Sequence, residues 1–220
     1  MPGKLKIKMR TNDPLVMPFT GETPQERLDR SMPLAGTPGH EYVETRGIPV
    51  SIAQNAGVRF DHDWNGRPAV IVPMLDNERK LCSVHGRYFI QIGKQDKMFT
   101  IGAGGGILSI GDALQSDPVI IVEGLFDALS LALYGYNALA TVGRLAPWLP
   151  KACTGKTVML AFDGNKPGEA AATFYKKYLD GSKTYRLTPP GHSKDWNSAL
   201  LKKTRGIINQ WIQYNLSRIR

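Results

Sequence analysis

The second half of the chain alternates between short apolar runs and helical patterns, and this alternation constrains the fold more than any other feature. Continuous apolar strands that alternate with helices are typical of a parallel sheet covered by helices on both faces. We therefore expect strands at residues 119–122, 138–142, 157–162 and 183–187, and helices at residues 126–134, 145–151, 168–179, 194–201 and 206–218. The predicted fold class is α/β, with a Rossmann-like parallel sheet.

The first half follows a different pattern. Residues 1–40 contain six prolines and four glycines, so we expect an extended arm with one short helix at Pro24–Ser31. Two segments read as strands on either side of a turn and predict a β-hairpin, namely Pro68–Leu75 and Lys80–Ile90. The expected organisation is an arm at 1–40, a smaller mixed α+β subdomain at 41–115, an α/β domain at 116–200 and a basic C-terminal helix at 201–220.

The formal net charge is +9, and the excess is larger in residues 111–220 than in residues 1–110. A basic balance of this size favours a partner that is a polyanion. No apolar run approaches the roughly 20 residues that a membrane-spanning helix needs, so we expect a soluble, cytoplasmic protein with no membrane partner. Cys82 and Cys153 are expected to be reduced thiols of the core.

Carboxylates follow the predicted strands at the points where those strands end. Glu123 follows the first strand with Asp127 one helical turn later, Asp163 follows the third strand, and Asp195 lies just past the fourth. The carboxyl ends of parallel strands meet at one edge of a sheet, where ligands bind. Oxygen ligands without Cys or His suit a hard cation such as Mg²⁺ or Mn²⁺. Alternatively, any one of these acids could simply match the dipole of a helix N-terminus.

These residues resemble the Toprim domain, which is shared by bacterial-type primases, topoisomerases and some nucleases. Its signature is a Glu-Gly after one strand and Asp-x-Asp-x-x-Gly after a later strand, and it stands here as Glu123-Gly124 and Asp163-Gly164-Asn165-Lys166-Pro167-Gly168. The upstream segments Tyr42 to Pro49, Pro68 to Asp76, His85-Gly86-Arg87 and Lys97-Met98-Phe99 look like the N-terminal part of a primase catalytic core. The resemblance covers about residues 41–200, with residues 116–200 as the Toprim domain.

The resemblance implies a set of site residues. Glu123, Asp163 and Asp195 would hold Mg²⁺ or Mn²⁺, and Glu123 and Asp163 would be catalytic with Asp127 in support. Asn165 stands where the family has its second Asp, and would be a neutral metal ligand. The residues implied to bind nucleic acid or nucleotide phosphates are Arg87, Lys94, Lys97 and Lys194. Arg46 is expected to be structural.

The implied function is a template-dependent, metal-dependent nucleotidyltransferase that makes primers on single-stranded DNA from nucleoside triphosphates. A helicase or a separate zinc-binding, start-site module is an implied partner, because the sequence resembles a stand-alone or trimmed core of a mobile element or phage. A nucleoid-associated location follows. The alternatives are a Toprim-type nuclease, and a catalytically weak module that binds single-stranded DNA, which Asn165 and the net charge suggest.

Overall fold

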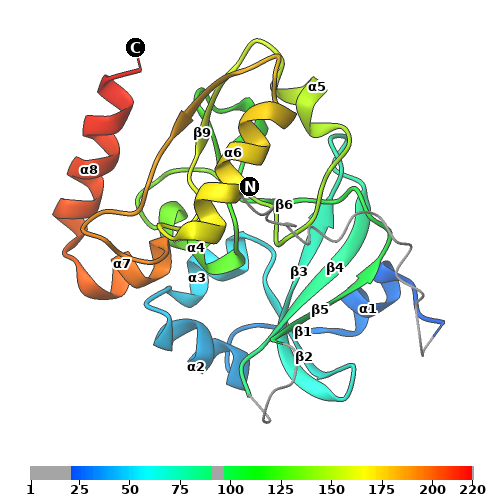
Figure 1. Ribbon diagram of the computed structural model, residues 1–220. Helices are drawn as coiled ribbons and strands as arrows, with labels where there is room; N and C mark the ends of the chain where they lie inside the picture. The colour runs from blue at the N-terminus through cyan, green and yellow to red at the C-terminus, as the bar shows by residue number, and fades with distance from the viewer. Residues whose placement is uncertain (1–20, 91–96, 220) are drawn as a thin grey trace, which may run out of the picture.

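The structure, a computed structural model, describes residues 21–90 and 97–219 and contains two five-stranded sheets (Figure 1). The first sheet has the order β1-β2-β3-β4-β5, and all its pairs are antiparallel. Its strands are β1 (Met32–Pro33), β2 (Arg59–Trp64), β3 (Arg67–Leu75), β4 (Leu81–Tyr88) and β5 (Met98–Gly102), and its helices are α1 (Pro24–Arg30), α2 (Pro38–Thr45) and α3 (Val50–Asn55). The predicted hairpin is therefore present as β3 and β4.

The segment predicted as an arm is described from residue 21 onward. A capping box at Thr23 and Glu26 starts α1, and β1 pairs with β2 at Met32 and Phe60. Residues 32–33 thus belong to the first sheet. The division of the whole chain into four parts stays a prediction.

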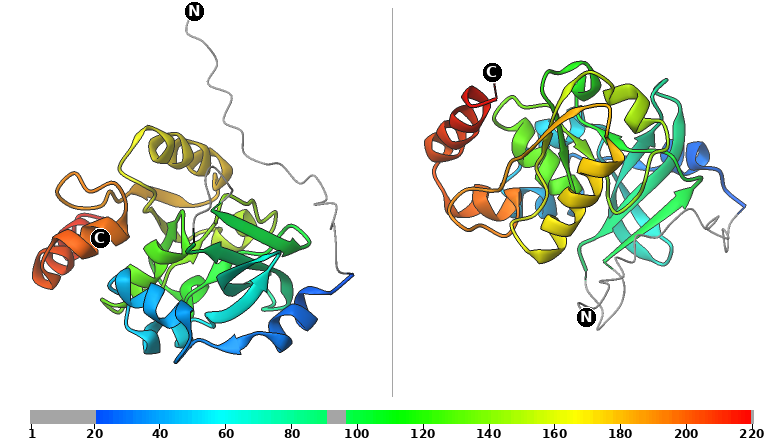
Figure 2. Two further views of the ribbon diagram at one scale, coloured as in Figure 1. Left: turned by 90° about the horizontal axis from the view of Figure 1, so that it is seen from below. Right: turned by 45° about the horizontal axis from the view of Figure 1, so that its top comes forward.

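The second sheet has the order β10-β9-β7-β8-β6, and its first four strands run parallel. Its strands are β6 (Leu108–Ser109), β7 (Val119–Val122), β8 (Leu139–Ala140), β9 (Thr157–Leu160) and β10 (Lys183–Arg186), and its helices are η1 (Ala113–Gln115), α4 (Leu125–Ala132), α5 (Leu149–Cys153), α6 (Lys166–Tyr178), α7 (Trp196–Lys202) and α8 (Arg205–Ser217). The predicted fold class is confirmed, with the short antiparallel edge strand β6 as an addition. Figures 1 and 2 place α1 and α8 at opposite ends of the molecule.

Helices cover both faces of the parallel sheet, as the apolar strands predict. Val119 and Ile121 of β7 pack in one core cluster with Tyr175 of α6. Ile120 and Val122 point to the other face, into a second cluster that includes α4, α7 and α8. The sheet is therefore buried on both sides, which is why its strands lack polar alternation.

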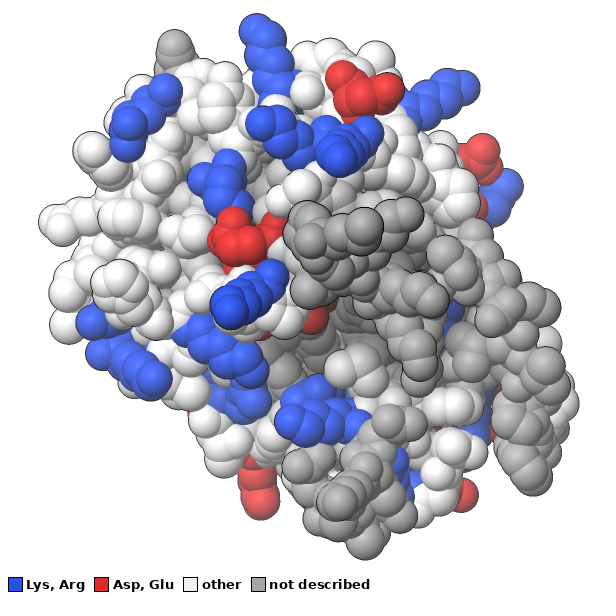
Figure 3. Space-filling model, viewed as in Figure 1, with Lys and Arg blue, Asp and Glu red and all other residues white. Residues whose placement is uncertain are grey.

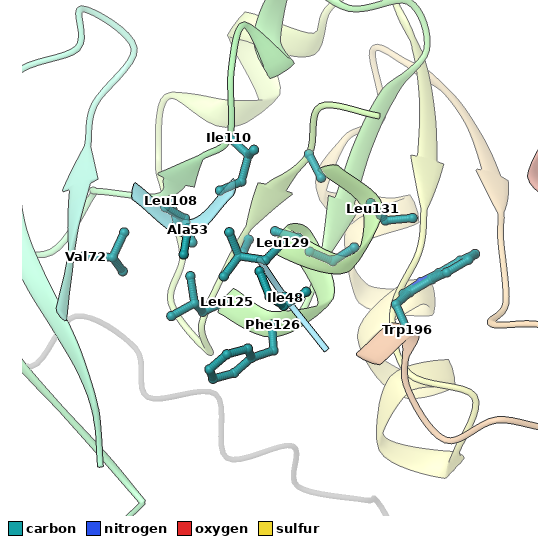
Figure 4. Close-up of a cluster of buried hydrophobic side chains, with 14 of the residues drawn as sticks. Ile48, Ala53, Val72, Leu108, Ile110, Leu125, Phe126, Leu129, Leu131 and Trp196 are labelled. Atoms are coloured by element: carbon teal, nitrogen blue, oxygen red, sulfur yellow. The ribbon is translucent and has the colours of Figure 1, made fainter. Parts of the chain in front are cut away.

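Helix α4 joins the two halves. Its residues 125–131 are all buried, including one acid, so the helix is enclosed on every side. Leu125 and Phe126 lie close to Ile48, and Val72 of β3 is part of the same cluster (Figure 4). Because α4 begins directly after β7, the core that joins the two sheets also fixes the end of β7.

The structure has no helix among its described residues that is both long and apolar enough to cross a membrane.

A buried histidine gives the fold a specific pH dependence. His85 on β4 is buried, its Nδ1 lies 2.9 Å from Thr100 Oγ1, and burial with nearby Arg144 and Arg87 lowers its pKa to about 3. The unfolded chain therefore takes up a proton near pH 6.5 that the folded protein does not accept. Above pH 6.5, neutral His85 makes its full contribution to the free energy of unfolding. This contribution is lost as the pH falls towards 3, and the loss is about 2 kcal/mol by pH 5.

We expect His85→Gln to flatten the fall in unfolding free energy between pH 7 and pH 5 relative to the natural chain. Urea unfolding at several pH values measures both slopes, and taking their difference removes the contribution of the carboxylates. Parallel profiles would show that His85 is not held neutral in the folded protein.

Candidate active site

Two of the predicted acids lie side by side because they follow neighbouring parallel strands. In the pairing of β7 with β9, Ile121 lies opposite Leu160. The N–H of Ala161 donates to the carbonyl of Ile121 at 2.7 Å, which continues the pairing one residue further. Glu123 and Asp163 leave this same edge of the sheet.

Burial and neighbouring negative charge disfavour the ionised forms of both Glu123 and Asp163. Glu123 is exposed, but the protein atoms around its carboxylate reduce its hydration, and this effect with nearby Asp163 and Asp195 raises its pKa against an opposing effect of Lys194. Partial burial and Asp195 raise the pKa of Asp163, and the Asn165 amide, Lys194 and Arg186 oppose that shift. Negative charge is therefore crowded at this edge, which is a condition that a bound cation relieves.

Asp127 is buried within electrostatic reach of Asp163 and Asp195. Its Oδ1 accepts hydrogen bonds from the backbone N–H groups of Trp196 at 2.9 Å and Asn197 at 3.4 Å. Burial and the charges of Asp163 and Asp195 raise its pKa to about 7, against the effect of those two hydrogen bonds. Asp127 thus ties α4 to the start of α7.

Asp195 and Asn165 both begin helices. Asp195 is the N-cap of α7, and its Oδ1 accepts from the Ser198 N–H at 2.6 Å. Asn165 is the N-cap of α6, with Oδ1 accepting from the Gly168 N–H at 2.9 Å. Its Nδ2 donates to Asp163 Oδ2 at 3.2 Å. The Asn165 amide therefore presents a donor, and not its oxygen, to the acid beside it.

Close packing explains why the motif that begins at Asp163 ends with a glycine at position 168. A Cβ on Gly168 would lie 2.1 Å from the carbonyl oxygen of Asp163, far inside van der Waals contact. The first turn of α6 therefore packs directly against the loop that carries Asp163. Only a residue without a side chain permits this close approach.

Among the residues predicted to bind phosphates, Lys194 has a clear electrostatic effect on the acids. Lys194 is exposed and close enough to lower the pKa values of Glu123 and Asp163. Arg87 lies on β4 with a buried Nε that has no hydrogen-bond partner among the described residues, and Lys97 is exposed beside β5. Lys94 lies outside the described residues. On the face in Figure 3, acidic atoms lie in the middle and Lys and Arg side chains lie around them.

Arg186 positions Asp163, although no local sequence pattern points to this role. Its Nη1 donates to the carbonyls of Leu160 at 2.9 Å and Phe162 at 2.8 Å, and its Nη2 donates to the carbonyl of Asp163 at 2.6 Å. Nε and Nη2 also bind Glu169 Oε1 at 2.9 and 2.6 Å. One side chain thus fixes both the end of β9 and the first turn of α6.

Arg46 joins the first subdomain to α7. Its Nε donates to Asn197 Oδ1 at 2.6 Å, and Asn197 Nδ2 returns a bond to the Arg46 carbonyl at 2.8 Å. The guanidinium carbon also lies 4.6 Å from the Phe126 ring centroid. These contacts agree with the expected structural role of Arg46.

The donor set suits a magnesium-type ion held by few protein ligands. Within residues 21–90 and 97–219, no group of three or more His, Cys, Asp or Glu side chains could hold one metal ion. Mg²⁺ usually retains several waters and binds through one or two carboxylates together with substrate phosphates. The crowded pair of Glu123 and Asp163 fits that description; Asp195 and Asn165 each use one side-chain oxygen in a helix cap.

Residues 120–200 match the family model described as Toprim-like, so this part of the chain is a Toprim-type domain. None of the curated protein sequences matches the chain. Solved structures show that the fold resembles the catalytic cores of primases, which confirms the resemblance seen in the sequence.

Three solved structures illustrate the likeness. The zinc-binding and RNA polymerase domains of the Aquifex aeolicus primase superpose with a TM-score of 0.66 at 17% identity, covering 88% of this chain and 62% of that one. The primase fragment of the bacteriophage T7 primase-helicase protein superposes with a TM-score of 0.56 at 18% identity, covering 79% of this chain and 72% of that one. A DnaG primase catalytic domain bound to single-stranded DNA superposes with a TM-score of 0.59 at 18% identity, covering 83% of this chain and 76% of that one. The chain therefore spans less than two thirds of the Aquifex structure.

Proposed function

We propose that this protein is a metal-dependent nucleotidyltransferase that synthesises primers on single-stranded DNA. The observation that supports this most directly is the pair of Glu123 and Asp163 at adjacent parallel strand ends, with Lys194 beside them and the primase-like antiparallel sheet opposite. The DnaG structure with bound single-stranded DNA supports the choice of template. The T7 primase-helicase protein supports a helicase as partner, and the zinc-binding domain of the Aquifex primase supports a separate start-site module.

In the reaction, a primer 3′-hydroxyl attacks the α-phosphorus of a nucleoside triphosphate, and pyrophosphate leaves. Glu123 and Asp163 would hold Mg²⁺ or Mn²⁺, which supplies positive charge to the phosphates. Arg186 keeps Asp163 in place, and Asp127 holds the start of α7 against α4. Arg87, Lys97 and Lys194 bind phosphate groups of the template or the nucleotide. Such a protein would work in the cytoplasm, at the nucleoid.

The deciding experiment incubates the protein with single-stranded template, labelled nucleoside triphosphates and Mg²⁺ or Mn²⁺. Labelled oligomers that depend on template and metal support the proposal. Shortening of the template without oligomer synthesis would identify a nuclease instead and overturn the proposal.

A second candidate is a single-stranded DNA-binding module with weak catalysis. The position of Asn165 favours it, because the amide caps α6 and adds no negative charge beside Asp163. Template binding without either synthesis or shortening would support this candidate.

We expect Asn165→Asp to strengthen binding of Mg²⁺ or Mn²⁺ by at least about tenfold, because a second carboxylate beside Asp163 adds attraction for the cation. An aspartate still caps α6, but it removes the amide that donates to Asp163, so the metal-free variant should be less stable than the natural protein. Calorimetric titration of both proteins measures affinity and stoichiometry. Equal values would show that position 165 does not contribute to metal binding.

A further inference from the structure

An arginine follows β8 at the edge of the parallel sheet that carries the acid pair. Strand β8 lies parallel to β7, with Val122 opposite Ala140, so the segment after β8 leaves the same edge as Glu123 and Asp163. The Val142 N–H donates to the Glu123 carbonyl at 2.7 Å. Arg144 follows two residues later and is half-buried.

The backbone around Arg144 is held in a specific conformation. Val142 has φ 44° and Gly143 has φ 74°, and a positive φ at a β-branched residue is unfavourable unless neighbouring contacts enforce it. The Arg144 N–H donates to the Thr141 carbonyl at 2.9 Å, and the Arg144 carbonyl accepts from the buried Tyr175 hydroxyl at 3.1 Å. The turn thus fixes where the Arg144 side chain begins.

The antiparallel sheet supplies a second arginine from the opposite side. His85 and Arg87 are two positions apart on β4 and so share a face. Their cross-strand partners are Val72 and Val70, both in the apolar cluster that contains α4. Arg87 and His85 therefore face the Toprim-type domain.

Both arginines lie near the neutral ring of His85. Arg144 and Arg87 each contribute to keeping that histidine uncharged, so both guanidinium groups are within electrostatic reach of one buried side chain. The Nε of Arg87 is buried without a hydrogen-bond partner among the described residues. Buried N–H groups in folded proteins are normally paired, so this donor points to a ligand or water.

We infer that Arg144, at the edge of the parallel sheet, and Arg87, on the face of the antiparallel sheet turned towards it, form a phosphate-binding site near the edge that carries Glu123 and Asp163. The inference rests on the proposed function for the source of the phosphate, which is either an incoming nucleoside triphosphate or the template backbone. Two guanidinium groups suit a phosphate group because each offers a planar fork of donors. Arg144 thereby becomes a substrate-binding residue contributed by the Toprim-type half.

Equilibrium binding tests the site without requiring catalysis. One arm titrates a non-hydrolysable nucleoside triphosphate with Mg²⁺, and the other titrates a labelled single-stranded thymidine oligonucleotide in EDTA. The variants are Arg144→Gln, Arg144→Lys and, as a matched control for charge, Arg218→Gln on the exposed end of α8. Thermal melting checks that each variant is folded.

We expect Arg144→Gln to weaken binding about tenfold or more in the arm that carries the phosphate, with Arg144→Lys intermediate because lysine keeps the charge and loses the fork. A loss in the nucleotide arm identifies the triphosphate, and a loss in the oligonucleotide arm identifies the template. If Arg144→Gln binds both ligands as tightly as Arg218→Gln, the inferred phosphate-binding site is wrong, even if the natural protein makes primers. If the natural protein makes no primers but Arg144→Gln loses binding, the proposed function fails and the site stands.

Discussion

Replacing Glu123 with glutamine is expected to abolish primer synthesis while leaving the protein folded. The amide keeps the shape of the side chain but lacks the charge that binds a hard cation. Metal stabilisation of transition-state charge is worth several kcal/mol, so loss of one of two carboxylate ligands should lower the rate by about 10³-fold. Labelled-oligomer synthesis at saturating Mg²⁺ measures this loss.

The same variant has a stability signature that a structural acid would not show. The protein disfavours the charge of Glu123, because reduced hydration and Asp163 raise its pKa. Removal of that charge should leave the metal-free protein as stable as before or slightly more stable. The rise in melting temperature on adding Mg²⁺ should be lost, because it measures binding to the folded state alone.

Glu41→Gln makes the same chemical change on the exposed surface of α2 and serves as the control. It should keep both the synthesis rate and the stabilisation by Mg²⁺. Full activity of Glu123→Gln would remove Glu123 from the catalytic role, and a large drop in its metal-free melting temperature would mean that the side chain supports the fold.

The acid pair could be predicted from the sequence because it depends on local patterns. Strands β7 and β9 are short apolar runs, and Glu123 and Asp163 come shortly after them. Parallel pairing of neighbouring strands then brings their ends together without further information. The capping roles of Asn165 and Asp195 also had local signals, namely Pro167 shortly after Asn165 and Ser198 three residues after Asp195.

Strand β2 was not predicted, because its pattern makes sense only with partners distant in sequence. It contains Asp61, which is buried and forms ion pairs with Arg27 at 3.6 Å and Arg30 at 3.5 Å. A charged residue in such a segment favours the prediction of a loop unless its ion-pair partners are known. Arg186 was missed for the same reason, since the carbonyls that it binds lie more than 20 residues earlier.

Replacing Gly86 with alanine is expected to destabilise the protein by about 3 kcal/mol or more, because β4 has no room for a side chain there. A Cβ on Gly86 would lie 2.0 Å from Nε1 and 2.3 Å from Cδ1 of Trp64. Trp64 is fully buried, and its Nε1 donates to the Phe99 carbonyl at 3.2 Å. The methyl group must therefore either displace the indole or bend β4 and shift the neighbouring Arg87.

Two further variants test whether the contact with the Trp64 indole causes the loss of stability in Gly86→Ala. Gly206→Ala, where a Cβ meets nothing within 4 Å and the residue lies in α8, should stabilise the protein by about 0.5–1 kcal/mol. Trp64→Phe removes the atoms nearest to the added methyl group, so Gly86→Ala should cost clearly less in that background than in the natural chain. Urea unfolding of the single and double variants measures this coupling. Additive losses would show that the indole does not fill the space over Gly86, and that the requirement for glycine beside Arg87 has another origin.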